Sequence, residues 1–285
     1  MNTFYIITNL LKDPQMKVAK HIQEYLEKQG RRCLIQEALK TEGLQSYKYT
    51  DPAKVPAEVD CVLVLGGDGT MLQASRDLVE RRIPLFGINL GTLGYLAEIG
   101  LKELEPALNK LLLDEYVLEE RMMLEGSAFH AGKRVLSDIA LNDIVIARSG
   151  RLRVIDFHIY VNNRFLNSYS ADGIVVATPT GSTGYSLSVG GPIVSPAASM
   201  ILITPIAPHT LTARSVILPD DAKVKVEIGQ RNMQEEAEAT FDGDTTVRMD
   251  CKDYIEIEKS ARTVSFVKID QVSFLEILRR KMSGA

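Results

Sequence analysis

Residues 65–70 read Leu-Gly-Gly-Asp-Gly-Thr and follow directly on the apolar run 59–65. A strand that ends in a glycine-rich turn before a helix makes an anion site, because bare backbone N–H groups approach phosphate oxygens and the helix N-terminus adds partial positive charge. Asp68 would repel a phosphate, so this carboxylate indicates a metal ion, or a proton taken from an attacking hydroxyl. The loop therefore predicts phosphoryl transfer. The residues expected to contact the phosphate donor are Gly66, Gly67, Gly69 and Thr70.

The alternative for this loop is a plain tight turn, since Gly and Asp are favoured wherever a turn needs positive φ. No Gly-Lys-Ser/Thr follows after a four-residue gap, so the P-loop class is disfavoured. Two further polar stretches shift the balance toward a ligand site.

The second stretch, residues 172–192, is dense in Gly, Ser and Thr and begins at Asp172. Its hydroxyls and bare backbone suit a polyhydroxylated or phosphorylated ligand, and Tyr185 offers a ring for stacking a base. A flexible polar linker is the alternative. It is disfavoured because the stretch begins with the strand-like residues 174–177 and ends in Gly-Gly-Pro-Ile-Val. The hydroxyl-bearing residues are Thr178, Thr180, Ser182 and Thr183.

The third feature is the pair Asn142-Asp143, which interrupts the apolar run 136–147. Adjacent residues of a strand point to opposite faces, so one of the two side chains is expected to point inward. A buried polar group without a partner costs a few kcal/mol, and a ligand hydroxyl or amine would supply that partner. A β-bulge or an edge position explains the pair equally well when it is taken alone.

Composition narrows the class of protein. At 285 residues the chain is long enough for two domains, with 45% hydrophobic and 25% charged residues. A net charge of −4 does not favour binding to nucleic acid, which usually requires an excess of positive charge. Cys33, Cys61 and Cys251 are scattered, which predicts a reduced cytoplasmic protein without a zinc site. No signal peptide is evident and prolines interrupt the longest apolar stretch, 193–208, so we expect a soluble protein that binds no membrane.

The elements that must position these residues change in kind near Tyr116. Before it, strand-like and helix-like segments alternate, which predicts a doubly wound α/β domain. Asp13 and Pro14 are expected to begin the first helix as N-cap and first-turn residue. The expected strands are residues 4–8, 32–36, 59–65 and 83–89, and the expected helices are 16–29, 70–82 and 101–113.

After Tyr116, short alternating runs between turn residues predict an antiparallel, β-rich, sandwich-like domain. A final helix, 271–282, is expected to return to the first domain and bury a face that carries Val272, Leu275, Leu278 and Met282. The predicted division is an α/β phosphate-binding domain at 1–116, completed by 270–285, and a β-rich domain at 117–269. The expected β-runs are 134–147, 154–161, 174–177, 200–205, 223–228, 237–241, 254–257 and 263–269.

Together the three stretches resemble the NAD kinase family, in its bacterial type. The matching residues are Gly66-Gly67-Asp68-Gly69-Thr70, the pair Asn142-Asp143, and Asp172-Gly173 running on through residues 178–188, with Gly191-Pro192-Ile193 and Pro208-His209-Thr210 beyond. The resemblance is collinear and covers essentially the whole chain. Diacylglycerol and sphingosine kinases share the first motif, whereas the 172–192 stretch is the specific one.

The resemblance implies that Asp68 accepts a proton from the 2′-hydroxyl of the adenosine ribose of NAD, with Gly69 lining the substrate. It implies that Asn142 and Asp143 bind the nucleotide and that Asp172 holds the other end of NAD. The residues that would wrap the adenosine half are Thr183, Gly184, Tyr185, Ser186, Leu187 and Ser188, and further contacts fall at Arg153, Ala207 and Asp244.

This chain departs from the family pattern in four places. Gly184 stands where many members have Ala, and Asp143 replaces the commoner Glu. Gln73 and Ser170 stand where some members carry basic contacts, so those two contacts are not carried over.

The implied activity is phosphorylation of NAD by ATP, or by another phosphoryl donor such as polyphosphate, to give NADP. Mg²⁺ is the implied metal, with ligands that the motifs do not identify, and the implied assembly is a homodimer or homotetramer. A lipid kinase of the diacylglycerol type is one alternative, although no exposed apolar or basic membrane-facing segment is evident. A non-catalytic dinucleotide sensor is the other, and Asp68 argues against it.

Overall fold

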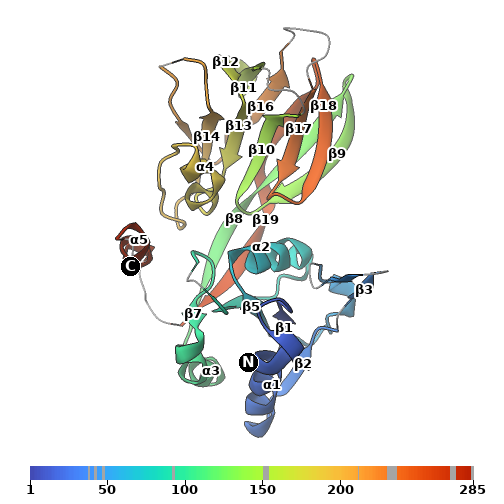
Figure 1. The fold of residues 1–285 in the computed structure, drawn as a ribbon, viewed down its shortest axis with the longest axis vertical. Coiled ribbons are helices and arrows are strands. Elements are labelled where there is room, and N and C mark those ends of the chain that lie inside the picture. Colours follow the sequence, from blue (N-terminus) through green and yellow to red (C-terminus); the bar gives the residue numbers. More distant parts are fainter. Residues whose placement is uncertain are drawn as a thin grey trace. The chain divides into compact units, whose positions relative to one another are not determined.

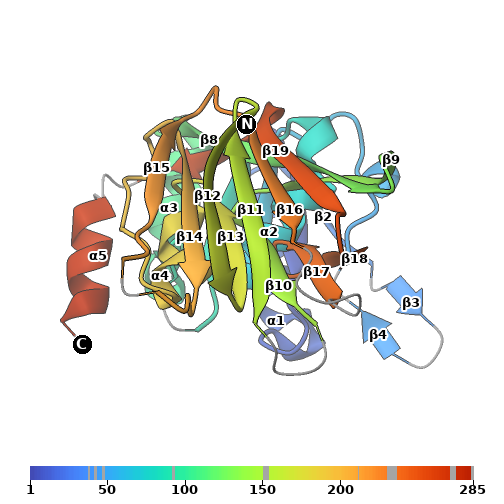
Figure 2. The same ribbon diagram turned by 90° about the horizontal axis from the view of Figure 1, so that it is seen from above.

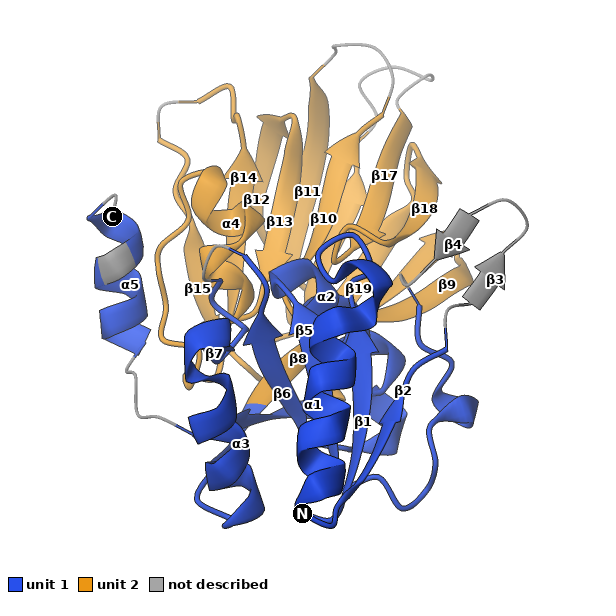
Figure 3. Cartoon of the chain, turned by 60° about the horizontal axis from the view of Figure 1, so that its bottom comes forward, with its two compact units in different colours: residues 1–120, 263–285 blue, residues 121–262 orange. Residues whose placement is uncertain are grey.

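The computed structural model describes residues 1–37, 39–41, 44–46, 49–91, 94–149, 154–210, 212–229, 236–269 and 274–283. The chain forms two compact units, one of residues 1–120 and 263–285 and the other of residues 121–262 (Figure 3). It changes unit inside strands β8 (Val117–His130) and β19 (Tyr254–Lys268), whereas the sequence places the domain limits just outside these positions, at 116 and 270. No helix in the described part of the chain is long and apolar enough to cross a bilayer.

The first unit is built on a parallel sheet in the order β2-β1-β5-β6. Strand β1 (Thr3–Thr8) lies between β2 (Arg32–Ile35) and β5 (Cys61–Gly66), and β5 pairs with β6 (Leu85–Asn89). The short β7 (Ile99–Gly100) and Phe266 of β19 also pair with β6. The chain order reverses between β1 and β5. The loops after these two strands therefore flank a topological switch point, where open α/β sheets bind ligands.

Helices cover both faces of this sheet (Figure 1). Helices α1 (Lys17–Lys28) and α3 (Leu104–Leu112) share one apolar cluster with alternate strand residues, among them Phe4, Leu63 and Phe86. Helix α2 (Asp68–Asp77) lies on the other face, because a Cβ built on Gly87 would be 2.8 Å from the sulfur of Met71. The predicted doubly wound domain is confirmed. A small hairpin, β3 (Leu39–Thr41) with β4 (Leu44–Ser46), follows β2.

Two helix predictions for this unit can be compared with the structure. The predicted N-cap is wrong: Asp13 and Pro14 begin a short 3-10 turn, Pro14–Met16, and the N-cap of α1 is Met16. The carboxylate of Asp13 nevertheless accepts the N–H groups of Val18 and Ala19 in the first turn of α1. Helix α5 (Phe274–Met282) belongs to the first unit, as predicted, and Lys281 lies 4.5 Å over the ring of Tyr95. Its apolar face is not the expected one: Leu275 and Met282 are exposed, and Ile277 is buried instead. Residues 271–273 of the predicted helix lie outside the described residues.

The second unit contains a six-stranded antiparallel sheet in the order β15-β14-β13-β10-β17-β18. A second antiparallel layer has β12, β11, β16 and β19 side by side (Figure 2), with β8 paired to β19 and to β9. The strands of the first sheet are β10 (Asp143–Arg148), β13 (Gly173–Ala177), β14 (Met200–Ile206), β15 (Val216–Pro219), β17 (Glu236–Phe241) and β18 (Thr245–Asp250). The remaining strands of the second are β9 (Lys133–Ala140), β11 (Ile155–Val161), β12 (Arg164–Ala171) and β16 (Val224–Ile228).

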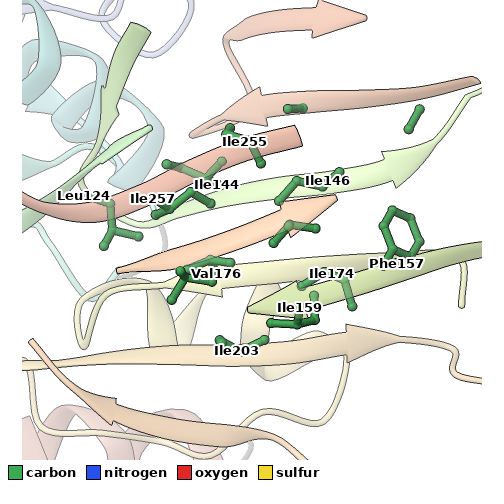
Figure 4. Close-up of a cluster of buried hydrophobic side chains, with 14 of the residues drawn as sticks. Leu124, Ile144, Ile146, Phe157, Ile159, Ile174, Val176, Ile203, Ile255 and Ile257 are labelled. Carbon is green, nitrogen blue, oxygen red and sulfur yellow. The ribbon is translucent and has the colours of Figure 1, made fainter. Parts of the chain in front are cut away.

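One apolar core joins these two sheets (Figure 4). Alternate residues face it from both sides, such as Ile144 and Ile146 of β10 against Phe157 and Ile159 of β11. Side chains from two sheets that fill one core are the defining feature of a β-sandwich, so the sandwich-like prediction is confirmed. A smaller cluster, Val175, Ala177 and Leu202, occupies the other face of the first sheet.

Several strand predictions are wrong in detail. The expected strand 134–147 is two strands, β9 and β10, and the expected strands 254–257 and 263–269 are one long strand, β19. Strand β8 was not predicted, because its polar residues Glu119, Glu120 and Arg121 break the period-two pattern. Strands β12, β15 and β18 were also missed. β12 carries exposed residues from 164 to 168 that read as a polar loop.

Candidate active site

The glycine-rich loop closes β5 and opens α2, as predicted. Helix α2 begins at Asp68, which places this acid in the first turn, where negative charge interacts favourably with the helix dipole. Asn9, at the end of β1, donates its N–H to the carbonyl of Leu65 at 2.9 Å and its side-chain amide to Thr70 Oγ1 at 3.3 Å. The two loops at the switch point are therefore tied to each other.

The carboxylate of Asp68 is held by backbone groups of a third loop. It accepts the N–H of Tyr95 at 2.8 Å and the N–H of Leu96 at 3.0 Å. Gly94 is buried against it, since a Cβ at Gly94 would lie 1.8 Å from Asp68 Oδ1. A carboxylate has about four lone-pair positions, so Asp68 is fixed in orientation and keeps the capacity to accept a further hydrogen bond.

A cavity of about 320 Å³ lies beside this loop. It contains the helix N-terminus, the Asp68 side chain and one cationic side chain, Lys12. The lining residues are Ile7, Asn9, Lys12, Thr50, Gly67, Asp68, Gly69, Thr70, Gln73 and Ala74.

In the second unit, Asn142 and Asp143 do not interrupt a continuous strand, which corrects the sequence-based interpretation. β9 ends at Ala140 and β10 begins at Asp143. The carboxylate of Asp242 accepts the N–H groups of Leu141, Asn142 and Asp143 at 2.7, 2.8 and 3.0 Å. These three bonds satisfy the backbone where the β-ladder stops, and they define the turn 141–143.

Asp143 is 6% exposed, and its carboxyl group has a perturbed acidity. Burial, and then the nearby charge of Asp242, raise the pKa of Asp143 to about 7, against a smaller opposing effect of the Tyr185 N–H. A carboxyl group that titrates near neutral pH is typical of a binding or catalytic site.

The hydroxyl-rich segment docks on this turn. Thr178 donates its N–H to the carbonyl of Asn142 at 2.9 Å and its hydroxyl to the carbonyl of Leu141 at 2.6 Å. Gly181 packs so closely that a Cβ there would lie 2.0 Å from the carbonyl oxygen of Asn142. A Cβ on Gly184 would be 3.6 Å from Asp143 Oδ2. The structure therefore brings Asn142, Asp143 and this segment together.

The side chains of the segment divide into two groups. Tyr185 is 43% exposed and Ser188 is also exposed, while Thr183, Gly184 and Leu187 are half-buried. Ser186 is fully buried, and its hydroxyl lies 3.3 Å from that of Thr204. This side chain therefore anchors the short helix α4 (Tyr185–Ser188) to strand β14.

Asp172 directly precedes the opposite end of β13, five residues from the Asp143–Ala177 pairing and about 17 Å away along the strand. Its carboxylate accepts a hydrogen bond from Arg148 Nε at 2.8 Å, and this ion pair raises the pKa of the Arg148 guanidinium further. Ala207 is near, since the N–H of Asp172 donates to the carbonyl of Ile206. Ala207 has a φ of 42°, an unusual conformation for a residue other than glycine.

The structure adds three residues that the sequence interpretation missed. Lys12 lines the cavity, Gly94 makes room for the Asp68 carboxylate, and Asp242 holds the turn 141–143. The glycine-rich run around Gly94 and the Asp242-Gly243 turn were visible signals, but within that turn the sequence favoured Asp244, whose N–H bonds the carbonyl of Phe241. The predicted contact Arg153 lies outside the described residues.

A doubly wound sheet with a glycine-rich loop and a fixed carboxylate at its switch point, joined in one chain to a β-sandwich with a second polar cluster, defines a phosphotransferase. Residues 4–116 match the ATP-NAD kinase N-terminal domain, and residues 141–269 match the ATP-NAD kinase C-terminal domain. The chain belongs to the ATP-NAD kinase family.

Relatives and solved structures agree with this assignment. The NAD kinase of Lachnospira eligens is 44% identical over 99% of this chain and 100% of its own length, and that of Lachnoclostridium phytofermentans is 43% identical over 99% of each chain. The crystal structure of yeast NADH kinase complexed with NADH has a TM-score of 0.83 at 24% identity, covering 99% of this chain and 88% of the yeast chain. The structure of an NAD kinase from Archaeoglobus fulgidus in complex with ATP has a TM-score of 0.79 at 24% identity and full coverage of both chains. The predicted family, fold and enzyme class are confirmed, and the lipid-kinase alternative is set aside.

Proposed function

We propose that the chain transfers the terminal phosphoryl group of ATP to the 2′-hydroxyl of the adenosine ribose of NAD, giving NADP, and that Asp68 orients this hydroxyl. One observation carries the assignment to Asp68. Its carboxylate is fixed by the N–H groups of Tyr95 and Leu96 at the edge of a cavity that also contains the glycine-rich loop. A fixed acceptor of this kind holds an attacking oxygen in one direction, which is the main requirement of phosphoryl transfer.

The chemistry required of Asp68 is modest. A carboxylate is a far weaker base than a sugar alkoxide, so it does not remove the hydroxyl proton in advance. In a loose transition state the bond from the attacking oxygen to phosphorus forms late, and the proton passes to the carboxylate as that bond forms. The Gly67 and Gly69 backbone and the N-terminus of α2 are oriented to stabilise negative charge on the transferred group.

The implied divalent metal fits this cavity in a limited way. Asp68 is the one carboxylate among the described lining residues, and Asn9, Thr50, Thr70 and Gln73 supply neutral oxygens. Mg²⁺ is commonly held by one or two carboxylates together with substrate phosphates and water, and such a donor set matches that pattern. The metal, when bound, would neutralise charge on the donor phosphates, and Asp68 would be its protein ligand.

Within the second unit we assign NAD binding to two polar clusters. Asn142 and Asp143, with residues 183–188, form the cluster that suits a ribose and a base, and Tyr185 exposes a ring for stacking. Asp172 and Ala207, about 17 Å further along the strands, form the cluster for the other half of an extended dinucleotide. Asp244 is retained as a further contact, in the same turn as Asp242.

We infer that the chain assembles as a homodimer or homotetramer. Support comes from β12, which among the described strands pairs with β11 alone and carries the exposed apolar side chains Phe165 and Leu166. An exposed edge strand with apolar side chains is a pairing surface. The cytoplasm remains the expected compartment, since Cys33, Cys61 and Cys251 are not paired in disulfides.

The substitution Asp68→Asn tests the proposed role. The amide keeps the shape but cannot take the proton, so we expect kcat to fall by about 10²- to 10⁴-fold. The affinity for NAD, measured by calorimetric titration, should change little. The assay incubates purified protein with ATP, Mg²⁺ and NAD and quantifies NADP.

The matched control is Asp221→Asn, at an exposed turn residue far along the sequence from the loop, which should keep wild-type turnover. Wild-type kcat in the Asp68→Asn enzyme would defeat the role given to Asp68. An absence of NADP with the wild-type enzyme would defeat the proposed reaction itself.

A further inference from the structure

The cavity at the switch point contains a full positive charge, on Lys12, that the motifs do not account for. Lys12 lies in the turn between β1 and α1, and its Nζ approaches the glycine-rich loop from the opposite side of the switch point. A Cβ built on Gly67 would lie 3.0 Å from this Nζ, and one built on Gly91 would lie 3.6 Å from it. The ammonium group therefore lies against bare backbone, at the place where a phosphate would meet the loop.

The backbone that carries Lys12 is fixed at both ends. The N–H of Lys12 donates to the carbonyl of Asn9 at 2.9 Å, and Asn9 is bound to Leu65 and Thr70 of the glycine-rich loop. On the other side Asp13 is buried and accepts hydrogen bonds from Thr8, Val18 and Ala19. The turn is thus anchored to β5 and to α1, and the freedom of Lys12 is confined to its own side chain.

Lys12 is an exposed residue, and within the described part of the chain its Nζ makes no hydrogen bond or ion pair, so the group is available to a ligand. It is also the one cation among the described residues that line the cavity. Gln73 is neutral, and its amide is already bound to the carboxylate of Asp77 at 3.0 Å. A triphosphate carries several negative charges, and the Asp68 carboxylate adds another. A helix N-terminus offsets only about half a charge, so the ammonium group of Lys12 would add a full positive charge to that of the helix and of the implied metal.

We propose that Lys12 binds the phosphates of the ATP donor and positions the terminal phosphoryl group against the glycine-rich loop. This inference rests on the proposed function, since it assigns the donor side of the cavity and leaves the acceptor to Asp68 and the second unit. A lysine ammonium offers three donors on a flexible stem, so it can follow the charge of a group in transfer.

The test is the substitution Lys12→Met, which keeps the length of the side chain and removes its charge. A lost charge-assisted contact corresponds to about a 10- to 100-fold rise in KM for ATP, whereas KM for NAD should stay within about 2-fold. Calorimetric titration of ATP with Mg²⁺ in the absence of NAD should show the same loss of affinity. Lys12→Arg, which restores the charge, should recover most of the affinity.

Lys20→Met is the matched control, because Lys20 is an exposed lysine of α1 that does not line the cavity. It should retain wild-type constants. An unchanged KM for ATP in Lys12→Met, or an equal rise in KM for ATP and for NAD, would overturn the assignment of Lys12. Either result would leave the proposed reaction intact as long as the wild-type enzyme forms NADP.

Discussion

Asp143 and Asp242 are neighbouring acidic residues whose carboxyl groups have different surroundings. The carboxylate of Asp242 accepts three consecutive backbone N–H groups, an arrangement that stabilises its charge. Asp143 is buried beside this charge, so its own ionisation is disfavoured and its pKa rises to about 7. Asp242 therefore positions the turn 141–143, and under the proposed function Asp143 would exchange a proton or a hydrogen bond with the bound ribose.

The raised pKa of Asp143 has a consequence for stability. The folded chain keeps this carboxyl protonated up to about pH 7, whereas the unfolded chain releases the proton near the ordinary aspartate pKa of 3.8. Between these values the folded state binds more protons, so the contribution of Asp143 to the free energy of unfolding falls as the pH rises. The substitution Asp143→Asn removes this dependence. We expect the variant to gain stability over wild type at about pH 8, on the order of a few kcal/mol, and much less at about pH 4.

Urea denaturation of the ligand-free protein at both pH values measures this difference. Asp221→Asn, at an exposed position, supplies the control and should show no such contrast. An Asp143→Asn effect of the same size at both pH values would contradict the raised pKa.

At the level of elements, the turn 141–143 and the segment 178–184 are packed together as one structural unit. β9 ends and β10 begins at this turn, where the carboxylate of Asp242 accepts backbone N–H groups that a neighbouring strand would otherwise bind. The segment 178–184 is attached to the same turn by the hydrogen bond from the N–H of Thr178 to the carbonyl of Asn142. Close packing at Gly181 brings α4 next to Asp143. The position of the segment 178–184 therefore depends on the absence of a side chain at Gly181.

The substitution Gly181→Ala tests this dependence. Its Cβ would lie 2.0 Å from the carbonyl oxygen of Asn142, so either the turn or the segment must move. We expect an affinity for NAD reduced by at least about 10-fold, and a loss of about 1–3 kcal/mol in the free energy of unfolding. Calorimetry and urea denaturation give the two quantities.

Gly184→Ala is the matched control, because its closest neighbour would be 3.3 Å away, at the carbonyl oxygen of Gly181, and the backbone N–H and carbonyl of residue 184 are kept. It should bind NAD nearly as wild type does. Equal effects of the two substitutions would show that the close contact at Gly181 is not what positions the segment.

At the scale of the whole molecule, β12 is the feature that points to assembly. It ends its sheet with 59% of Phe165 and 40% of Leu166 exposed. Burying these two side chains in a partner would remove apolar surface from water and satisfy the open strand edge. The same strand is paired with β11, whose alternate residues fill the sandwich core.

Light scattering of the purified protein should give two or four times the chain mass of 31.6 kDa. The double substitution Phe165→Lys with Leu166→Lys places charge on the edge and should yield a smaller species. Leu113→Lys, at another exposed apolar residue, should leave the mass unchanged. A monomeric wild-type protein would refute the assembly, and an unaltered mass of the double variant would exclude β12 as the interface.

Local sequence determined much of this protein. The apolar runs of β1, β5 and β6 predicted buried parallel strands, because strands covered on both faces require apolar side chains at every position. Glycines placed between such a strand and a helix predicted the phosphate loop, since both the turn and the bare N–H groups are local properties. The period-two pattern likewise predicted a sandwich. The limits of β8 and β19 were not predictable in this way, because these long strands carry polar residues over part of their length.

Tertiary structure alone decided which side chains hold the site in place. Asp242 lies about 100 residues from the turn that it fixes, and Tyr95 and Leu96 lie 27 and 28 residues from the carboxylate that they orient. Lys12 meets Gly67 only because β1 and β5 are neighbours in the sheet. Sequence patterns report what a residue needs from its immediate neighbours. Hydrogen bonds and charges between distant segments depend on how the strands are ordered, and that order is set by the packing of the whole unit.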